Sequence, residues 1–505
     1  MGEFVHEWGS PFLDQTPGDV EVGGTPRRVP GACWSRTIPA SVPLPSMKLW
    51  SVDTANQIGI ELKDPMIWGG QQQLPGMDCF AQRYGGHQFG NWAGQLGDGR
   101  AITLGQRTVK SGWVELQLKG SGITPYSRRG DGKAVLRSSV REFLCSEAMH
   151  HLGVPTSRAL SLVETGEHVM RDILYNGQPA PEPGAIICRV APSFLRFGTY
   201  QIHVADGQAE ALAALVEHTL QTHFPTHHMN DDDGLIAWFR ELASTTANMV
   251  AQWMRVGFVH GVMNTDNMSV HGITIDYGPY GWLENFDRTW TPNTTDASTR
   301  RYRYSQQPAI AGWNLARFLE SMVPLMKSPE RLQSVLEHYS IEFTRLHTSS
   351  WMSKLGLKNW TDSDGELLEE LQNLLEEVET DMTIFFRELS HLTAPDITAL
   401  KAAFYDPNQI PFGWKSWLER WWERCDSTPD RDAMLQANPK YVLRNWMAQM
   451  AIEKAEKGDY SLCEELHQLL KHPYDEQPGH ETAWYAKRPE WARDKVGCSM
   501  LSCSS

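Results

Sequence analysis

The alternation of apolar and polar residues between positions 113 and 119 predicts a β-strand, because successive side chains of a strand point to opposite faces. The apolar face comprises Val114, Leu116 and Leu118, and the polar face comprises Glu115, Gln117 and Lys119. The segment "LRSSVREFLCSEAMHHLGVP" that follows has helical periodicity, and Gly153 and Pro155 are placed to end the helix. A strand Lys followed by a helix Glu is the ion pair that positions phosphates in kinases.

Two glutamates of this predicted helix are candidates to pair with Lys119. Glu147 falls on the main apolar stripe of the helix, whereas Glu142 lies opposite it, within a second and partly apolar face. If the main stripe packs on the sheet or on another lobe, the second face could look into a cleft. Periodicity therefore leaves both assignments open.

Helical patterns dominate the rest of the chain. The apolar residues of "LLEELQNLLEEVETDM" repeat along one helical face, which predicts a helix packed on a C-terminal lobe. Four tryptophans share the spacing of another helical face, which favours core packing over a ligand cage. These tryptophans are Trp414, Trp417, Trp421 and Trp422.

The order of the patterns predicts an α+β protein with a small mixed lobe followed by a large helical lobe. Residues 1–80 are rich in Pro, Gly and Thr, and we expect them to form an irregular N-terminal extension. The mixed lobe is expected over residues 81–205 and the helical lobe over residues 206–490. Residues 491–505 form a polar tail that contains cysteine.

Composition narrows the possible partners. The chain has 505 residues and a net charge of −15, which disfavours a broad nucleic-acid footprint or binding to an anionic membrane, since both need clustered Lys and Arg. No apolar run approaches the length of a bilayer span, and the start "MGEFVHEWGS" resembles neither a signal peptide nor a transit peptide. We therefore expect a cytoplasmic protein.

The cysteines fall into two groups. Six are scattered without metal-ligand spacing, which is typical of reduced and mostly buried thiols. Cys498 and Cys503 instead lie close together in the tail "GCSMLSCSS", where nothing obvious would bury them.

The segment "HGVMNTDNMSVHGITIDYG" resembles the catalytic centre of a protein kinase with one part changed. Kinase loops read H-R-D-x-x-x-x-N and are followed by a strand and D-F-G. His260 and Asn267 keep this spacing, Asp276 begins the D-F-G-like triplet, and Val262 stands where the base is expected. Asn267 and Asp276 are the better pair of Mg²⁺ or Mn²⁺ ligands, which leaves Asp266 for the proton or for a supporting role.

Glycine and arginine motifs complete the set of candidate residues. Gly97 and Gly99 precede an apolar strand, where small residues let backbone N–H groups approach an anion. The turn "SRRGDGK" is a basic segment in an acidic protein, which argues for an anionic ligand. Arg189 and Arg196 in "CRVAPSFLRFG" are candidates to hold phosphate oxygens.

Together these segments resemble the selenoprotein O family, also called the YdiU family. The resemblance rests on "YGGHQFGNWAGQLGDGRAITLG", "LQLKGSGITPYSRRGDGKAVLRSSVREFLCSEAMHHLGVPTSRAL", "GFVHGVMNTDNMSVHGITIDYGPYGWLENFD" and "NPKYVLRNWMAQMAIEKAEKGDY", and it extends to the final "CSS". The family implies a protein-kinase-like two-lobed fold. It also implies transfer of AMP from ATP to Ser, Thr or Tyr hydroxyls of proteins, with the nucleotide flipped relative to kinases and pyrophosphate released.

The resemblance also implies roles for individual residues. Asp266 would be the general base, Asn267 and Asp276 the metal ligands, and Glu142 rather than Glu147 the partner of Lys119. The nucleotide ligands would be Gly97, Gly99, Arg100, Lys119, Asp131, Gly132, Arg189, Arg196 and Asp276. Many eukaryotic members have selenocysteine at the position of Cys503, which implies a redox role for the tail with Cys498 as a candidate resolving thiol.

The leading hypothesis is therefore a protein adenylyltransferase that uses ATP with Mg²⁺ or Mn²⁺ and acts on protein substrates, redox proteins among them. The alternatives are an ordinary protein kinase, a protein uridylyltransferase using Mn²⁺, and a nucleotide-binding redox scaffold without turnover. Some family members are mitochondrial, so the cytoplasmic assignment holds unless the chain is a eukaryotic member that lacks its leader.

Overall fold

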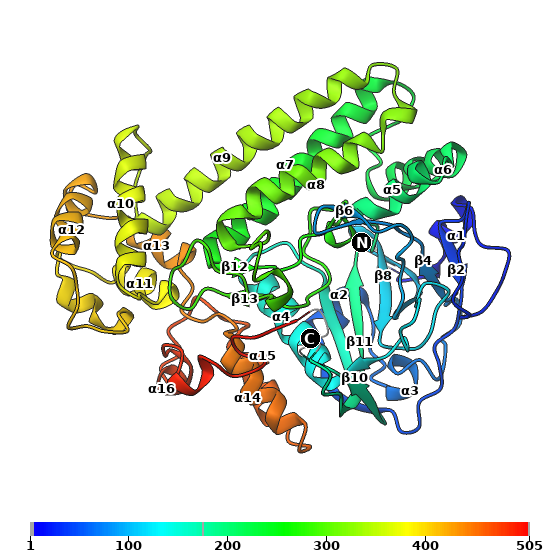
Figure 1. The fold of residues 1–505 in the computed structure, drawn as a ribbon, viewed down its shortest axis with the longest axis horizontal. Helices are drawn as coiled ribbons and strands as arrows, with labels where there is room; N and C mark the ends of the chain where they lie inside the picture. Colours follow the sequence, from blue (N-terminus) through cyan, green and yellow to red (C-terminus); the bar gives the residue numbers. More distant parts are fainter. Residues whose placement is uncertain (1–4, 174–175, 503–505) are drawn as a thin grey trace.

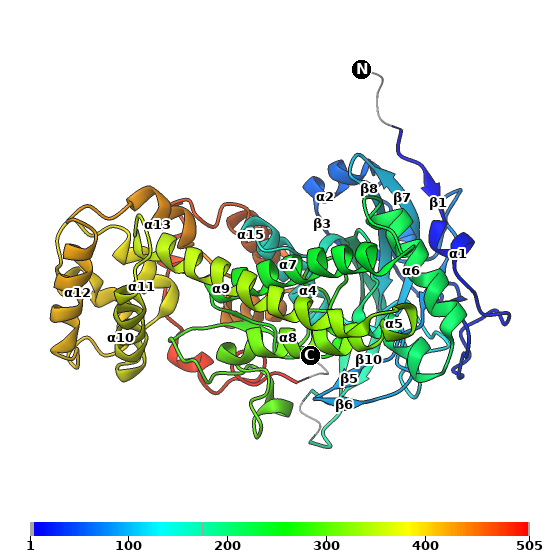
Figure 2. The ribbon, with the colours of Figure 1, turned by 90° about the horizontal axis from the view of Figure 1, so that it is seen from above.

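The computed structural model describes residues 5–173 and 176–502. A sheet of antiparallel strands forms one end of the molecule and helices form the remainder (Figure 1). Seen from above, the sheet and the helices α10 to α13 again lie at opposite ends (Figure 2). The architecture is the predicted α+β arrangement of a small sheet lobe and a large helical lobe.

The sheet has the strand order β2-β4-β7-β8-β11-β10-β3, with β1 pairing with β7 and β9 pairing with β11. Its strands are β1 (Trp8–Gly9), β2 (Trp34–Arg36), β3 (Ser46–Trp50), β4 (Phe80–Gln82), β7 (Ala101–Val109), β8 (Gly112–Lys119), β9 (Ala134–Val135), β10 (Arg158–Arg171) and β11 (Ala180–Ala191). The strand predicted over 113–119 is thus confirmed as β8. Its apolar face packs in a core with Ile67 and Trp68, and its polar face is also buried, with Lys119 reaching Asp276 of the helical lobe.

Residues 1–80, which we expected to form an irregular extension, contribute several short strands and helices to the sheet lobe. β1, β2 and β3 join the sheet, the short helix α1 (Pro11–Gln15) lies between β1 and β2, and the short helices α2 (Val52–Ile58) and α3 (Pro65–Trp68) follow β3. β3 pairs with β10, more than one hundred residues further along the chain. Pairing with such distant partners lets short strands form in a sequence that lacks local periodicity.

Helix α4 (Leu136–His151) confirms the predicted helix and packs against β10 and β11 on one side. On another side it contacts α14 (Asn445–Ala455) and α15 (Ser461–Leu469) of the helical lobe. Most of its side chains are buried. The helix therefore joins the two lobes, which is why polar residues on it can reach the space between them.

The helical lobe has three central helices and a second group, α10 to α13, at the end of the molecule opposite the sheet (Figure 2). The three central helices, which pack against one another, are α7 (Asp232–Val256), α8 (Gln307–Glu320) and α9 (Gln333–Leu355). The other helices are α5 (Phe197–Ala205), α6 (Ala209–His223), α10 (Ser363–Glu377), α11 (Met382–Leu389), α12 (Gly413–Arg424), α13 (Arg431–Ala437) and α16 (Glu481–Trp484). The predicted leucine and tryptophan helices are confirmed as α10 and α12, with Trp414, Trp417 and Trp421 fully buried.

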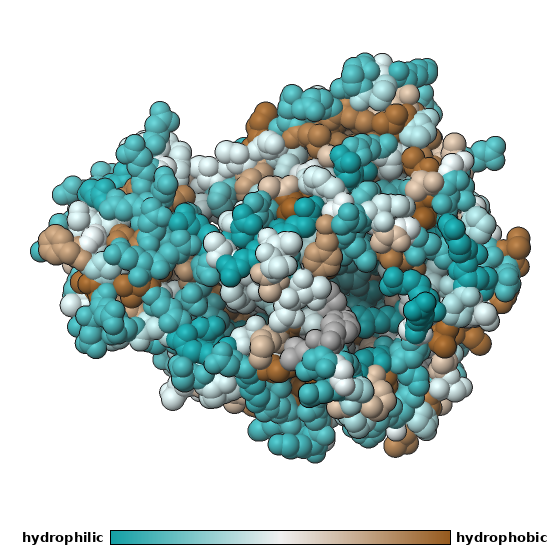
Figure 3. Space-filling model, viewed as in Figure 1, coloured by the Kyte–Doolittle hydropathy of each residue, from teal (hydrophilic) through white to brown (hydrophobic). Residues whose placement is uncertain are grey.

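The surface is rich in polar residues (Figure 3), as the charged residues of the sequence predict. Figure 3 shows a mostly hydrophilic face with scattered apolar patches. Within the described part of the chain, no helix is both long and apolar enough to cross a bilayer.

The last two described residues, Leu501 and Ser502, are hydrogen-bonded to other parts of the fold. The carbonyl oxygen of Leu501 accepts hydrogen bonds from the backbone N–H of Thr294 at 2.8 Å and from its hydroxyl at 2.9 Å. The next hydroxyl, that of Ser502, donates to the carbonyl oxygen of Ile173, in the connection between β10 and β11. The tail thus contacts both lobes.

Candidate active site

A cleft of about 700 Å³ lies between the lobes. From the sheet lobe it is lined, among others, by Gly97, Gly99, Arg100, Lys119, Asp131, Gly132 and Arg189. From the helical lobe it is lined by Val262, Asn264, Asp266, Asn267 and Asp276. The fold therefore brings together nearly all of the residues that the sequence suggested for nucleotide, metal and proton chemistry.

Lys119 forms its ion pair with Glu142. The Nζ atom of Lys119 lies 2.7 Å from Oε2 of Glu142, and both side chains are buried. Glu147 instead faces the N-terminal segment, where its carboxylate accepts two hydrogen bonds at 2.8 Å from Arg158 and one at 2.7 Å from Ser51. Both faces of α4 are packed, and the structure distinguishes the two glutamates where periodicity left them open.

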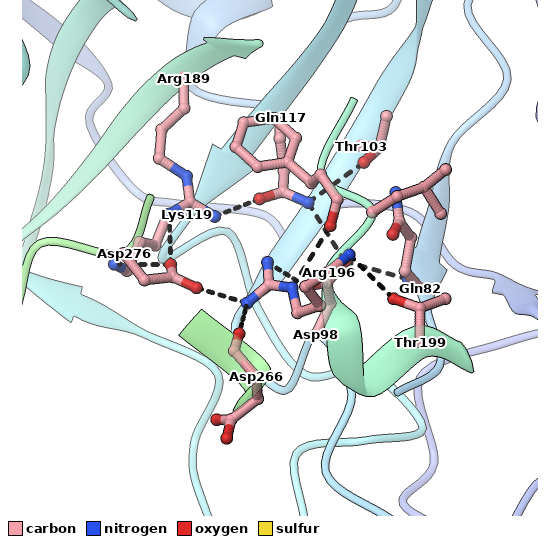
Figure 4. A network of polar contacts seen from close by, with 12 residues as sticks. Gln82, Asp98, Thr103, Gln117, Lys119, Arg189, Arg196, Thr199, Asp266 and Asp276 are labelled. Carbon is pink, nitrogen blue, oxygen red and sulfur yellow. Dashed lines mark hydrogen bonds and ion pairs between the residues drawn. The ribbon is translucent and has the colours of Figure 1, made fainter. Parts of the chain in front are cut away.

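Asp276 is surrounded by cationic groups (Figure 4). Its carboxylate accepts a 2.5 Å hydrogen bond from Arg189, pairs with Arg196, and lies 3.5 Å from Nζ of Lys119. Burial alone would raise the pKa of Asp276, but Arg196, Arg189 and Lys119 outweigh burial and hold that pKa well below its usual range. The carboxylate is therefore ionised and held in place before any ligand enters.

Arg196 is placed differently from what its expected contact with nucleotide requires. Its side chain is buried, lies over the ring of Tyr84, and donates a 2.9 Å hydrogen bond to the carbonyl oxygen of Asp266. It is not among the residues that line the cleft, whereas Arg189 is. In this structure Arg196 holds Asp276 and the backbone of the catalytic loop in place from its buried position outside the cleft.

Two glycines of the sheet lobe are packed too closely against their neighbours to carry a side chain. Gly97 has φ +78°, and a Cβ atom there would overlap the ring of Tyr126. Gly132 has φ +71°, and its Cβ would meet the carbonyl group of Gly122. Both positions thus need glycine for backbone conformation and for close packing.

The basic turn beside these glycines faces the cleft. Arg128, Arg129 and Lys133 line it together with Arg171, which pairs with Asp131 at 2.7 Å. Arg171 is a cleft residue that the sequence reasoning missed, because its position at the end of a long strand carries no local signal. The group gives this wall of the cleft the positive charge expected for an anionic ligand.

Asp266 of the catalytic loop lies inside the cleft. Val262, which stands at the sequence position of the kinase base, lines the same cleft. Asp266 belongs to the single turn Thr265–Asn267, and the loop is held to the following segment by His260, whose Nε2 lies 3.1 Å from the carbonyl oxygen of Ile275. One carboxylate oxygen of Asp266 is buried without a hydrogen-bond partner among the described residues. Burial raises the pKa of Asp266 to about 6, although Gln88 and Arg196 oppose the rise.

Asn267 and Asp276 fit a hard divalent cation by their donor chemistry. The amide nitrogen of Asn267 donates to the carbonyl oxygen of Val262 at 2.8 Å, which leaves the amide oxygen available on the cleft side. Among the described residues no group of three His, Cys, Asp or Glu side chains could hold a metal. A site with two protein oxygens therefore relies on phosphate oxygens or water for its remaining ligands.

Of the two tail cysteines, the structure describes Cys498, which is not among the residues that line this cleft. Cys498 is buried, which contradicts the expectation that nothing would cover it, and its carbonyl oxygen accepts a 2.9 Å hydrogen bond from Asn445. Burial raises the pKa of the Cys498 thiol to about 11, so little thiolate forms near neutral pH. Cys503 lies outside the described residues.

Comparison with known proteins places the chain among nucleotidyltransferases. The model of a family described as protein adenylyltransferase SelO matches residues 31–471. A protein nucleotidyltransferase YdiU of Aromatoleum aromaticum is 50% identical, with 98% of each chain covered, and one of Flavobacterium johnsoniae is 47% identical with the same coverage. A solved Toxoplasma gondii virulence factor, described as having a protein-kinase fold and no enzymatic activity, matches at 12% identity and a TM-score of 0.23, covering 59% of this chain and 87% of its own. So low a score carries no argument about this chain.

Proposed function

The chain belongs to the protein adenylyltransferase SelO family and is a nucleotidyltransferase, and on that premise we propose that it transfers AMP from ATP to hydroxyl side chains of proteins. The acceptors proposed are Ser, Thr and Tyr, including those of redox proteins. The relatives reported above are bacterial, which lends no support to a mitochondrial location.

The observation that carries the proposal is the position of Asp266. Asp266 lines the same cleft as Asp276 and as Lys119, which pairs with Glu142, and one oxygen of the Asp266 carboxylate has no hydrogen-bond partner among the described residues. Attack by a hydroxyl group needs a base within hydrogen-bond reach of the proton that it removes. Asp266 is the carboxylate of the cleft that is not committed to a cationic partner, and we assign it that role.

The reaction proposed is a displacement at the α-phosphorus. The acceptor oxygen forms a bond to this phosphorus, the bond to the bridging oxygen of the β-phosphate breaks, and pyrophosphate leaves with the bonding electrons. The acceptor proton passes to Asp266. Lys119 and Arg189 hold phosphate oxygens and neutralise the charge of the leaving group, and Arg196 acts through its contact with Asp276.

The remaining contacts follow from the walls of the cleft. Gly97, Gly99 and Arg100 would approach the nucleotide from one side, and Asp131 and Gly132 from the other. Asn267 and Asp276 would hold Mg²⁺ or Mn²⁺, which supplies positive charge to the phosphates when bound. The proposal includes the flipped nucleotide that the family implies, with the α-phosphate toward the acceptor hydroxyl.

The experiment uses ATP labelled at either the α- or the γ-phosphate, incubated with the purified chain and casein as a hydroxyl-rich protein acceptor. We expect α-label and the mass of AMP on protein. Transfer of γ-label with the mass of phosphate would establish a kinase instead, and preferential labelling by UTP with Mn²⁺ would establish uridylyl transfer. Nucleotide binding without any product under these conditions would favour the redox scaffold.

A further inference from the structure

The segment from Gly85 to Trp92 belongs to one of the sequence motifs of the family, and none of its residues is among those assigned to the nucleotide or the metal. It forms a separate hairpin of β5 (His87–Gln88) and β6 (Asn91–Trp92) outside the main sheet. Phe89 and Gly90, the two residues of its turn, both have positive φ angles, of 49° and 88°. Two-residue turns of this kind match the twist of the flanking strands, so they fix the register of a hairpin.

The backbone of this hairpin is fastened to the catalytic loop. The N–H of His87 donates to Oγ1 of Thr265 at 2.7 Å, and the N–H of Phe89 donates to Oδ1 of Asn264 at 3.1 Å. The hydroxyl of Tyr302 donates to the same Asn264 oxygen at 2.6 Å. These contacts lie on both sides of Gln88, so the main chain at Gln88 is held without help from its side chain.

The side chain of Gln88 contacts the proposed base. Its amide nitrogen donates to Oδ2 of Asp266 at 3.3 Å, and Gln88 itself lines the cleft. The other oxygen, Oδ1, is the buried one without a partner. Gly86 packs directly on this carboxylate, since a Cβ atom there would lie 2.5 Å from Oδ1 and 2.9 Å from the carboxyl carbon.

We propose that Gln88 is a positioning residue: its contact with Oδ2, together with the packing of Gly86 against Oδ1, fixes the rotation of the Asp266 carboxylate for removal of the proton from the acceptor hydroxyl. This inference rests on the proposed role of Asp266 as base. A carboxylate with one anchored oxygen loses the rotational freedom that otherwise has to be removed at the moment of reaction. The close contact with Gly86 limits the same carboxylate from the other side.

The test is a double-mutant cycle between Gln88 and Asp266. Gln88→Met keeps the length of the side chain and removes the donor, and Gln88→Lys restores a donor. We expect Gln88→Met to lower kcat for transfer to casein by roughly 10- to 100-fold, as for loss of a hydrogen bond to a charged group, with the KM for ATP and the melting temperature unchanged. Gln88→Lys should recover part of kcat.

In the Asp266→Asn background, Gln88→Met should cause no further loss, because a residue that acts through Asp266 has nothing left to position. Losses that multiply would overturn the inference, as would a wild-type kcat in Gln88→Met. The matched control is Gln95→Met, since Gln95 lies in the same motif but donates to the carbonyl oxygen of Arg27.

The cycle also separates this inference from the proposed function. If Asp266→Asn transfers nucleotide as fast as the unmodified chain, the assignment of the base fails and the role of Gln88 fails with it. If Asp266→Asn is impaired while Gln88→Met is not, the base stands and only the positioning role is refuted.

Discussion

Glu142 and Glu147 lie on the same helix and make a matched pair for testing which ion pair serves chemistry. The change is Glu→Gln at each position, which keeps the size of the side chain and removes its charge. Glu147 is 1% exposed and receives two hydrogen bonds from Arg158, one from Ser51 and one from the N–H of Ala159 at 3.1 Å. None of these partners lines the cleft.

The expected cost of Glu147→Gln is in stability. Removing one partner of a buried ion pair leaves an uncompensated charge, here on Arg158, and costs about 3–5 kcal/mol. For a cooperative unit of the size of the sheet lobe this corresponds to a fall in melting temperature of roughly 10 °C. At 20 °C the folded variant should transfer nucleotide at nearly the wild-type rate.

Glu142→Gln should behave in the opposite way. Glu142 contacts Lys119 at 2.7 Å and Arg189 at 2.9 Å, and both cations also face Asp276. Asp276 therefore still compensates them in part, so the loss of stability should be smaller than for Glu147→Gln. Lys119 loses its orientation toward phosphate, and we expect kcat/KM to fall about 10²-fold, as for loss of one preorganised electrostatic contact.

The assay measures initial rates of α-label transfer at 20 °C, after circular dichroism has established that each variant is folded at that temperature. Thermal unfolding of the same samples gives the stability change. A Glu147→Gln variant that is folded but less active than Glu142→Gln would refute the reasoning, because it would place the functional pair on the other face of α4.

Three further outcomes are expected. Asp266→Asn should bind ATP within about twofold of wild type by calorimetry and transfer it 10²- to 10⁴-fold more slowly, as for loss of a general base; equal transfer rates would remove that role. Gly132→Ala should lower the free energy of unfolding in urea by about 1–3 kcal/mol and weaken ATP binding, because the positive φ and the Gly122 carbonyl group leave no place for a methyl group. An unchanged free energy of unfolding would contradict this geometry. Burial lowers the pKa values of His203 and His218 to about 4 from the ordinary 6.5, so the fold favours their neutral forms, and the stability they contribute is complete above pH 6.5 and lost as the pH falls toward 4. Between pH 7 and pH 5 each histidine should lower the free energy of unfolding by about 2 kcal/mol, as measured by urea unfolding at the two pH values. His203→Gln should show a smaller loss of stability over this range than the wild type. An equal loss in the variant and the wild type would exclude His203 as a cause.

Local patterns were sufficient for some elements and residues. The alternation in β8 and the periodicity of α4, α10 and α12 are properties of short segments, so the sequence alone predicted them. The kinase-like spacing from His260 to Asp276 likewise led to residues that line one cleft.

Other features depend on contacts between distant segments, and local reasoning missed them. β3 forms because its backbone pairs with β10, and Cys498 is buried because the tail packs beside Asn445. Gln88 stood inside a recognised motif, but only the folded chain shows that its side chain reaches Asp266.

The contacts of Leu501 and Ser502 add one more attachment between the lobes, besides the packing of α4 on α14 and α15. The covalent crossing lies where β11 ends, near Ala191, whereas Ser502 reaches Ile173 beyond the opposite end of the β10–β11 ladder. At the rise of a β-strand these two points are roughly 30–40 Å apart. Separating the lobes at this end therefore requires the contacts of Leu501 and Ser502 to break together with the packing of α4 on the helical lobe.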